Sequence, residues 1–306
     1  MEQGLAPSEA IEKLSPIIKK NLNDWDIEHI KPLAAPKAVL DDTAKFLLFN
    51  KQRIPEAVLI CGKTEFGNLA GRSAERVSNI RASLQGDEKK AVLAPLDYGD
   101  INGLNFALWP YRKPLSGNKI LGRLQRYSLR KKILSWLHNA THQTIQKPLN
   151  AELEEVFISP LKALQSSEEI KGTLDKRVHN FIGKIESQSW KPVFTMAHND
   201  LWVGNVLNAK DNKYKISVID WAGSNLKGIA IFDLVKICID LRVRGNAYSI
   251  EVKKACDLLE CDMHDSEGYL LASMALLLQN IEHFPRDRFF KLLQRVHRFH
   301  MSNLGL

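Results

Sequence analysis

The hydrophobic pattern divides the chain into a strand-rich part followed by a mainly helical part. Apolar residues recur at helical spacing in residues 1–25, and a second helix is predicted from Ser73 to Leu84 with Ser73 as its N-cap. Short apolar or alternating runs between turn residues are typical of strands. The runs predicted as strands are Ile27–Leu33, Lys45–Phe49, Ala57–Cys61, Val92–Leu96 and Leu104–Trp109.

Beyond Pro110 and Pro114 the pattern becomes helical, with one strand-rich island. The island consists of the short apolar runs Pro192–Met196, Val206–Leu207 and Ile216–Ile219. We therefore expect an α+β protein with an N-terminal lobe at residues 1–110 and a larger helical lobe at residues 111–306.

The composition is that of an ordinary globular protein. The 306 residues are 44% hydrophobic and 25% charged, which excludes a disordered, collagen-like or coiled-coil chain. Four cysteines do not make a disulfide framework, and the start MEQGLAPSEA lacks the features of a secretory signal. The longest apolar run, Tyr269–Leu278, is too short to cross a bilayer. We expect a soluble, cytoplasmic protein without a transmembrane segment.

Candidate chemistry gathers in the strand-rich island. His198-Asn199-Asp200 follows one apolar strand, and Asn205 comes five residues after Asp200. Asp220 follows the next strand, 15 residues after Asn205. Two carboxylates and an amide oxygen are hard ligands, suited to Mg²⁺ bound together with nucleotide phosphates.

These two motifs resemble the catalytic and metal loops of the aminoglycoside phosphotransferase/choline kinase family, whose members are small-molecule relatives of protein kinases. His198-Asn199-Asp200 with Gly204-Asn205-Val206-Leu207, and Ile219-Asp220-Trp221, are most similar to the choline/ethanolamine kinase branch. The resemblance implies a bilobal protein-kinase-like fold and an enzyme that uses ATP and Mg²⁺.

The resemblance also implies roles for individual residues. Asp200 would accept the proton of the substrate hydroxyl, and His198 would brace the catalytic loop. Asn205 and Asp220 would hold Mg²⁺. Asp233 stands where the family has an aspartate that opens the next helix. Asp and Asn also favour simple turns, but turns alone explain neither the spacing nor the second motif.

The N-terminal part departs from the family pattern. Ala34-Ala35-Pro36-Lys37 has no glycine where protein kinases cover the phosphates with a glycine-rich loop. The nucleotide-binding lysine expected at the end of the third strand is Lys63, unless the strand places Ile60 or Cys61 there. Glu75 is the candidate for the glutamate that would pair with Lys63.

Two further positions concern the nucleotide and the metal. In the family, the link between the lobes passes the adenine, and here Leu108 and Trp109 are the candidate contacts, because Pro110 has no N–H to donate. An ordinary link with a core tryptophan explains this segment equally well. Ala222 replaces the glutamate that often follows the tryptophan of the metal motif.

Two stretches concentrate positive charge within a chain of net charge +8. Lys119, Arg123, Arg126 and Arg130 share one helix face, and a second group lies between Arg286 and Arg298. A solvated helix face is the simpler interpretation. The alternative is contact with an anionic acceptor, a glycan or a membrane surface. Cys256, Cys261 and His264 do not have the spacing of a zinc site.

The function predicted from these residues is phosphate transfer to a hydroxyl of a small molecule. The acceptor would be an amino alcohol such as choline or ethanolamine, or a sugar or glycan. The alternative is a pseudokinase that binds a nucleotide or ligand without turnover, which the glycine-free loop and Ala222 would favour. A nucleic-acid partner is not expected, because no aromatic residues alternate with the arginines and no binding motif is present.

Overall fold

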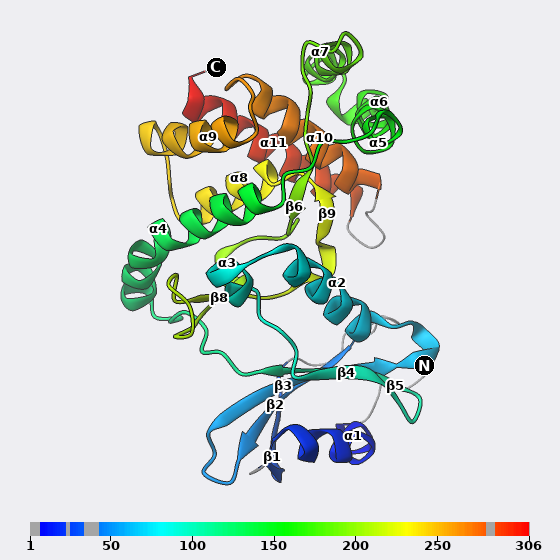
Figure 1. Cartoon of the computed structure of the whole chain (residues 1–306), viewed down its shortest axis with the longest axis vertical. Coiled ribbons are helices and arrows are strands. Elements are labelled where there is room, and N and C mark those ends of the chain that lie inside the picture. The colour runs from blue at the N-terminus through cyan, green and yellow to red at the C-terminus, as the bar shows by residue number, and fades with distance from the viewer. Residues whose placement is uncertain (1–6, 23–24, 34–42, 280–284, 306) are drawn as a thin grey trace. The chain divides into compact units, whose positions relative to one another are not determined.

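A computed structural model describes residues 7–22, 25–33, 43–279 and 285–305 of the chain (Figure 1). The chain forms two compact units. The β-rich unit comprises residues 1–82, 89–114 and 207–222, and the helical unit comprises residues 83–88, 115–206 and 223–306. The α+β class and the strand-rich N-terminal part are therefore confirmed. The glycine-free segment Ala34–Lys37 lies outside the described residues.

The β-rich unit is built on a five-stranded antiparallel sheet in the order β1-β2-β3-β5-β4. The strands are β1 (Trp25–Pro32), β2 (Ala44–Asn50), β3 (Pro55–Lys63), β4 (Asp97–Ile101) and β5 (Leu104–Pro110). Alternate side chains of β3 point to opposite faces. Ala57, Leu59 and Cys61 join the core formed with α1 (Pro7–Asn21), whereas Ile60 packs against Ala70 and Ala74 of α2 (Leu69–Ser83).

Two details of this unit differ from the prediction. Val92–Leu96 is not a strand: Val92 makes one isolated bridge to Val218, and β4 is the more polar segment that follows. The apolar side chains of Val92 and Leu93 are buried in a connecting segment, so their hydrophobicity reports burial and not strand pairing.

The second helix starts earlier than predicted. It begins at Leu69, and Asn68, not Ser73, caps it by accepting a hydrogen bond from the Gly71 N–H at 2.9 Å. A side chain at position 71 would displace this cap, because its Cβ would lie 2.2 Å from Asn68 Oδ1.

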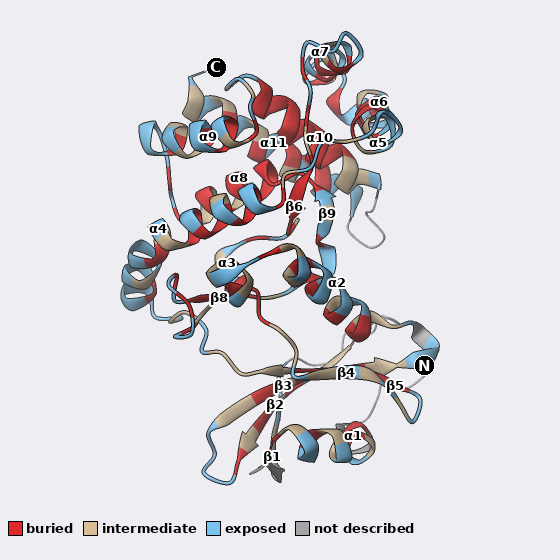
Figure 2. Cartoon of the chain, in the orientation of Figure 1, coloured by how far each residue is buried: buried red, intermediate tan, exposed pale blue. Residues whose placement is uncertain are grey.

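The helical unit contains α4 to α11, whose buried faces form its core (Figure 2). The helices are α4 (Lys119–Gln143), α5 (Asn150–Leu153), α6 (Ser159–Gln165), α7 (Asp175–Glu186), α8 (Ile231–Asp240), α9 (Asn246–Leu258), α10 (Asp265–Gln279) and α11 (Arg286–Leu304). A short helix, α3 (Gly86–Ala91), connects α2 to β4. None of the helices in the described ranges has the length and apolarity required to span a bilayer.

Short strands deliver the loops of the predicted site. β6 (Thr195–Ala197) pairs with β9 (Asn225–Gly228) in the helical unit. β7 (Val206–Asn208) pairs with β8 (Ile216–Val218). These strands confirm the strand-rich island, although β9 was not predicted.

Candidate functional site

The segment from His198 to Asn205 is a loop that leaves β6 and ends in a 3-10 turn, Val203–Asn205. His198 is buried and accepts the Asp200 N–H at its Nδ1 atom, at 3.3 Å. Asp200 is exposed, with 55% of its side chain accessible. Asn199 adopts a left-handed backbone (φ 65°), and its Nδ2 donates to the Gly223 carbonyl at 2.8 Å. A rigid turn therefore presents the carboxylate of Asp200 to solvent.

Asp233, in the first turn of α8, anchors the start of this loop. Its carboxylate accepts the His198 N–H at 2.6 Å and the Leu201 N–H at 3.4 Å. Asp233 is 1% exposed, and burial raises the pKa of its carboxyl group above the usual range. The predicted location of Asp233 at the opening of a helix is confirmed, and its contacts show what the side chain does there.

Two further residues of α8 contact the loop, and sequence analysis missed both. Lys236 Nζ lies 2.5 Å from Asp200 Oδ1, and Asp240 accepts the Val203 N–H at 3.2 Å. Asp233, Lys236 and Asp240 are three and four residues apart, so they share one face of α8. Three polar residues at this spacing on an otherwise apolar helix are the feature of the sequence from which these contacts could have been predicted.

Asn205 is buried and held in a defined orientation. Its Nδ2 donates to the Asp200 carbonyl at 2.9 Å, with a longer contact of 3.5 Å to Asp200 Oδ2. This orientation directs the amide hydrogens toward Asp200 and leaves Oδ1, a hard oxygen donor that suits Mg²⁺. The structure therefore brings Asp200 and Asn205 together.

Asp220 lies in the β-rich unit, two residues after β8. It is exposed and has a left-handed backbone (φ 65°). Trp221 beside it is 1% exposed and donates its indole N–H to the Val218 carbonyl at 3.0 Å. The packing of Trp221 fixes the turn in which the Asp220 carboxylate stands. Ala222, at the position of the family's glutamate, is exposed.

Strand register separates the candidate residues of β3. Ile60 lies on the α2 face, whereas Cys61 lies on the opposite face, in the core with α1. Lys63 is directly opposite Leu104 of that core in the register of β3 and β5, and its ammonium pairs with Glu65 at 3.4 Å. Directly opposed residues of antiparallel strands share a face. Lys63 therefore belongs to the Cys61 face of the strand.

A different lysine lies beside Ile60. Lys45 of β2 is directly opposite Ile60, so the exposed Lys45 side chain shares the α2 face of the sheet. Glu75 is on the exposed side of α2, while Ala74 of the same helix packs with Ile60. Whether Lys63 reaches Glu75 stays a prediction.

Leu108 and Trp109 occupy the end of β5. The Leu108 side chain is fully buried on the α1 side, and its carbonyl accepts the Leu96 N–H at 2.7 Å. Trp109 lies on the α2 face, and its indole nitrogen is buried without a hydrogen-bond partner among the described residues. The two residues thus face opposite sides of the sheet, and their contact with adenine stays a prediction.

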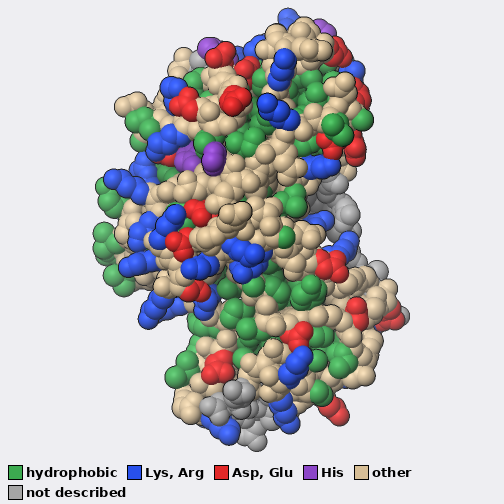
Figure 3. All heavy atoms as spheres, in the orientation of Figure 1, with side chains coloured by type: hydrophobic (Ala, Val, Ile, Leu, Met, Phe, Trp, Pro, Cys, Tyr) green, Lys and Arg blue, Asp and Glu red, His purple; other side chains and the backbone are tan. Residues whose placement is uncertain are grey.

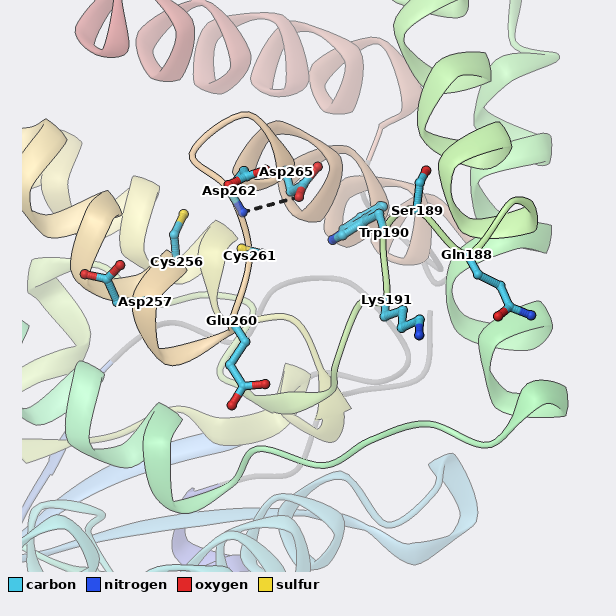
Figure 4. A pocket seen from close by; sticks show the side chains of 10 residues that line it. All are labelled: Gln188, Ser189, Trp190, Lys191, Cys256, Asp257, Glu260, Cys261, Asp262 and Asp265. Carbon is cyan, nitrogen blue, oxygen red and sulfur yellow. Dashed lines mark hydrogen bonds between the residues drawn. The ribbon is translucent and has the colours of Figure 1, made fainter.

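The helical unit also has a hollow of about 520 Å³ that contains none of the predicted site residues (Figure 4). Four carboxylates, two cysteines and Trp190 line it, together with Gln188, Ser189 and Lys191. Cys256 is buried and Cys261 half-buried. In the described part of the chain, no three His, Cys, Asp or Glu side chains are grouped as metal ligands.

Comparison with known proteins identifies the fold. No protein-family model matches the chain, and no curated protein is similar to it in sequence. Solved structures do match over nearly the whole length. A fructosamine-3-kinase from Haemophilus somnus 129PT gives a TM-score of 0.55 at 14% identity, covering 95% of this chain and 97% of the other.

Two other matches are similar. A spectinomycin phosphotransferase solved with ADP and spectinomycin gives a TM-score of 0.51 at 14% identity, covering 99% and 100% of the two chains. A choline kinase from Cryptosporidium parvum Iowa II gives 0.50 at 14% identity, covering 96% and 95%. The resemblance inferred from the loop motifs is thereby confirmed at the level of the fold. The chain has the protein-kinase-like fold that these small-molecule kinases share.

Proposed function

We propose that the protein is a small-molecule kinase that uses Mg²⁺ and ATP to phosphorylate a hydroxyl group. The observation that supports this best is the loop from His198 to Asn205. The buried Asp233 fixes the backbone of this loop. The loop exposes the Asp200 carboxylate near its start and ends at Asn205, whose buried amide is held in one orientation. A simple polar turn requires neither the buried carboxylate nor the fixed amide.

In this proposal Asp200 accepts the proton of the acceptor hydroxyl. The hydroxyl oxygen forms a bond to the terminal phosphorus of ATP while the bond from that phosphorus to the bridging oxygen breaks, and ADP leaves. Positioned general-base assistance contributes about 10²–10⁴-fold. His198 keeps the turn in place through its bond to the Asp200 N–H.

The metal would be held by Asn205 Oδ1 and by the Asp220 carboxylate. When bound, Mg²⁺ would spread the negative charge that develops on the transferred phosphoryl group. The chain's own part is to present both oxygens from turns fixed by buried neighbours, Asp233 for one and Trp221 for the other. Asp220→Ala should weaken Mg²⁺-ATP binding, and unchanged affinity by calorimetry would count against this assignment.

The nucleotide would contact Leu108 and Trp109 with its base and a lysine with its phosphates. Lys63, with Glu75 as its partner, is the phosphate-binding lysine expected from its place at the end of the third strand. Lys45 is the assignment that the strand register favours, because it extends from the same face as Ile60 and Trp109. The two assignments make different predictions, which are compared in the Discussion.

The surroundings of Asp200 favour a sugar or glycan over a cationic acceptor. The Lys236 ammonium offsets the charge of the carboxylate that would otherwise attract a cation. Trp221 is buried and cannot offer its ring face to a quaternary ammonium, although Trp202, 47% exposed, could. A neutral or anionic acceptor therefore fits this end of the helical unit better than choline or an aminoglycoside.

The experiment is a screen with radiolabelled ATP and Mg²⁺ against sugars, sugar phosphates, choline, ethanolamine, amino acids and aminoglycosides. Asp200→Ala should reduce turnover of any acceptor found by at least about 100-fold while ATP affinity is retained. Asp287→Ala, an exposed site on α11, is the matched control and should leave turnover unchanged.

The same experiment tests the pseudokinase alternative. If the wild-type protein binds Mg²⁺-ATP, phosphorylates none of the acceptors and does not hydrolyse ATP, the pseudokinase alternative is correct. If Asp200→Ala keeps full turnover, the proposed mechanism is wrong.

A further inference from the structure

The N-terminal half of α4 exposes apolar side chains to solvent. Two to four helical turns beyond its start, Leu129 and Ile133 are buried against the helical unit, as expected for a packed helix. The opposite side carries four large side chains that are each more than half exposed. They are Ile120 (72%), Leu121 (56%), Leu124 (60%) and Tyr127 (76%).

These four residues form one surface. Ile120, Leu124 and Tyr127 are spaced four and three apart, which aligns them along one stripe of the helix, and Leu121 lies beside it. We call this stripe the α4 apolar row. Single exposed apolar residues are common on proteins, but a contiguous row usually marks a contact surface.

A row of cations runs next to the α4 apolar row. Lys119, Arg123, Arg126 and Arg130 are spaced four, three and four apart, and Lys131 and Lys132 follow. The whole of α4, Lys119–Gln143, contains no Asp or Glu. Figure 3 shows hydrophobic and basic side chains side by side over the free end of α4, which Figure 2 shows as exposed.

Ion pairs distinguish this basic stretch from the second one. Within the described ranges, none of the six cations forms an ion pair with a carboxylate. The second basic stretch behaves differently: on α11, Arg286 pairs with Glu169 at 2.7 Å and Lys291 with Asp287 at 3.7 Å. The simpler interpretation, a solvated helix face, therefore fits α11 but does not account for α4.

We propose that the α4 apolar row and its cations dock on the surface of an anionic lipid bilayer. A helix with an apolar stripe beside lysines and arginines lies in the plane of a membrane interface. Each Lys or Arg near an anionic surface contributes about 1 kcal/mol of attraction, and the apolar side chains enter the boundary between headgroups and acyl chains. Tyr127 is of a type enriched at that depth.

Other occupants fit this surface less well. A second copy would bring six cations against six cations, which repel. A nucleic acid would match the charge, but the row offers it one aromatic ring, Tyr127, and three aliphatic side chains that do not stack on bases. An acidic amphipathic protein segment would match both the charge and the apolar row. The four apolar side chains project from the exposed surface of a helix, however, where a fluid bilayer can surround them. This inference does not depend on the proposed kinase activity.

The test is cosedimentation of the full chain with vesicles of phosphatidylcholine alone or of equal parts phosphatidylcholine and phosphatidylglycerol. We expect the wild-type protein to sediment with the anionic vesicles only, and less so as salt is raised. Arg123→Glu/Arg126→Glu should weaken this binding by at least about 10-fold. Ile120→Gln/Leu124→Gln should weaken it by about 10-fold while the salt dependence remains.

The matched control is Arg295→Glu/Arg298→Glu, which makes the same change of net charge on the exposed side of α11 and should bind vesicles as the wild type does. Because all six substituted positions are exposed, thermal melts should show folded protein. The proposal is wrong if the wild type leaves both vesicles in the supernatant. It is also wrong if the α11 control loses binding as strongly as the α4 variants, or if an acidic amphipathic peptide binds the α4 surface and vesicles do not.

Discussion

Lys236 Nζ lies 2.5 Å from Asp200 Oδ1, so the candidate catalytic carboxylate is oriented by an ammonium from a different element. Lys236 is the less exposed partner, with 17% of its side chain accessible, and its ammonium also lies 5.4 Å from the centre of the Phe232 ring. Lys236 is thus positioned by packing on α8, and Asp200 by the loop that α8 anchors.

Replacing Lys236 should separate turnover from nucleotide binding. Lys236→Met keeps most of the length of the side chain but removes the charge that orients Asp200, so kcat should fall by about 10-fold or more. The ATP dissociation constant should stay within about twofold, and Lys236→Arg should recover much of the lost kcat. Steady-state kinetics with calorimetry measure both. Equal kcat in the wild type and Lys236→Met would show that the ion pair has no role in turnover.

Asp233 should matter for folding as well as for activity. In Asp233→Asn, an amide NH₂ would face a backbone N–H that now donates to a carboxylate, leaving one buried donor without an acceptor. The expected cost is about 1–3 kcal/mol of unfolding free energy, with reduced kcat. Urea unfolding measures the first quantity.

Asp240→Asn is the graded control, because Asp240 accepts one backbone N–H, at 3.2 Å, where Asp233 accepts two, and Asp240 is only half-buried. It should destabilise the protein less than Asp233→Asn. If the two substitutions cost the same, burial of the anchor is not what holds the loop.

The two lysine assignments can be separated by ATP affinity. If the strand register is decisive, Lys45→Ala should weaken Mg²⁺-ATP binding by about 10- to 100-fold, while adenosine binding is unchanged because the base does not contact the ammonium. Lys63→Ala should then have little effect. The reverse result would support Lys63. Lys19→Ala, an exposed lysine on α1, is the control of equal charge.

A second buried histidine of the helical unit, His300 of α11, should make the protein sensitive to acid. His300 is fully buried; Tyr248 Oη lies 2.6 Å from its Nδ1 and Ser266 Oγ 3.0 Å from its Nε2. Burial lowers the pKa of His300 from 6.5 to about 4. Between these pH values the unfolded chain binds the proton and the folded chain does not, so stability falls as the pH decreases through this window.

The loss should be on the order of 3 kcal/mol between pH 6.5 and pH 4. His300→Gln removes the titrating group. It should be less stable than the wild type at pH 7.5, and the difference should shrink as the pH falls. Urea unfolding over a pH series measures it, and a difference that stays constant with pH would contradict the assignment.

Local sequence was enough for much of the fold and for part of the site. Strands such as Ala57–Cys61 follow from the local pattern, because burial of one face of a strand leaves alternating apolar residues in the sequence. Asp200 and Asn205 could be placed in one loop from their spacing, since residues five apart in a short turn lie close together in space.

The tertiary structure decided what depends on contacts between distant segments. Lys236 meets Asp200 across 36 residues, and Lys45 stands beside Ile60 only through the register of two strands. The polar segment Asp97–Ile101 becomes a strand because β5 offers it an unpaired edge. In the apolar segment Val92–Leu96, by contrast, Val92 and Leu93 are buried, and Val92 makes an isolated bridge and no strand. Periodicity reports which side of an element is buried, but the partner that buries it is fixed by packing over the whole chain.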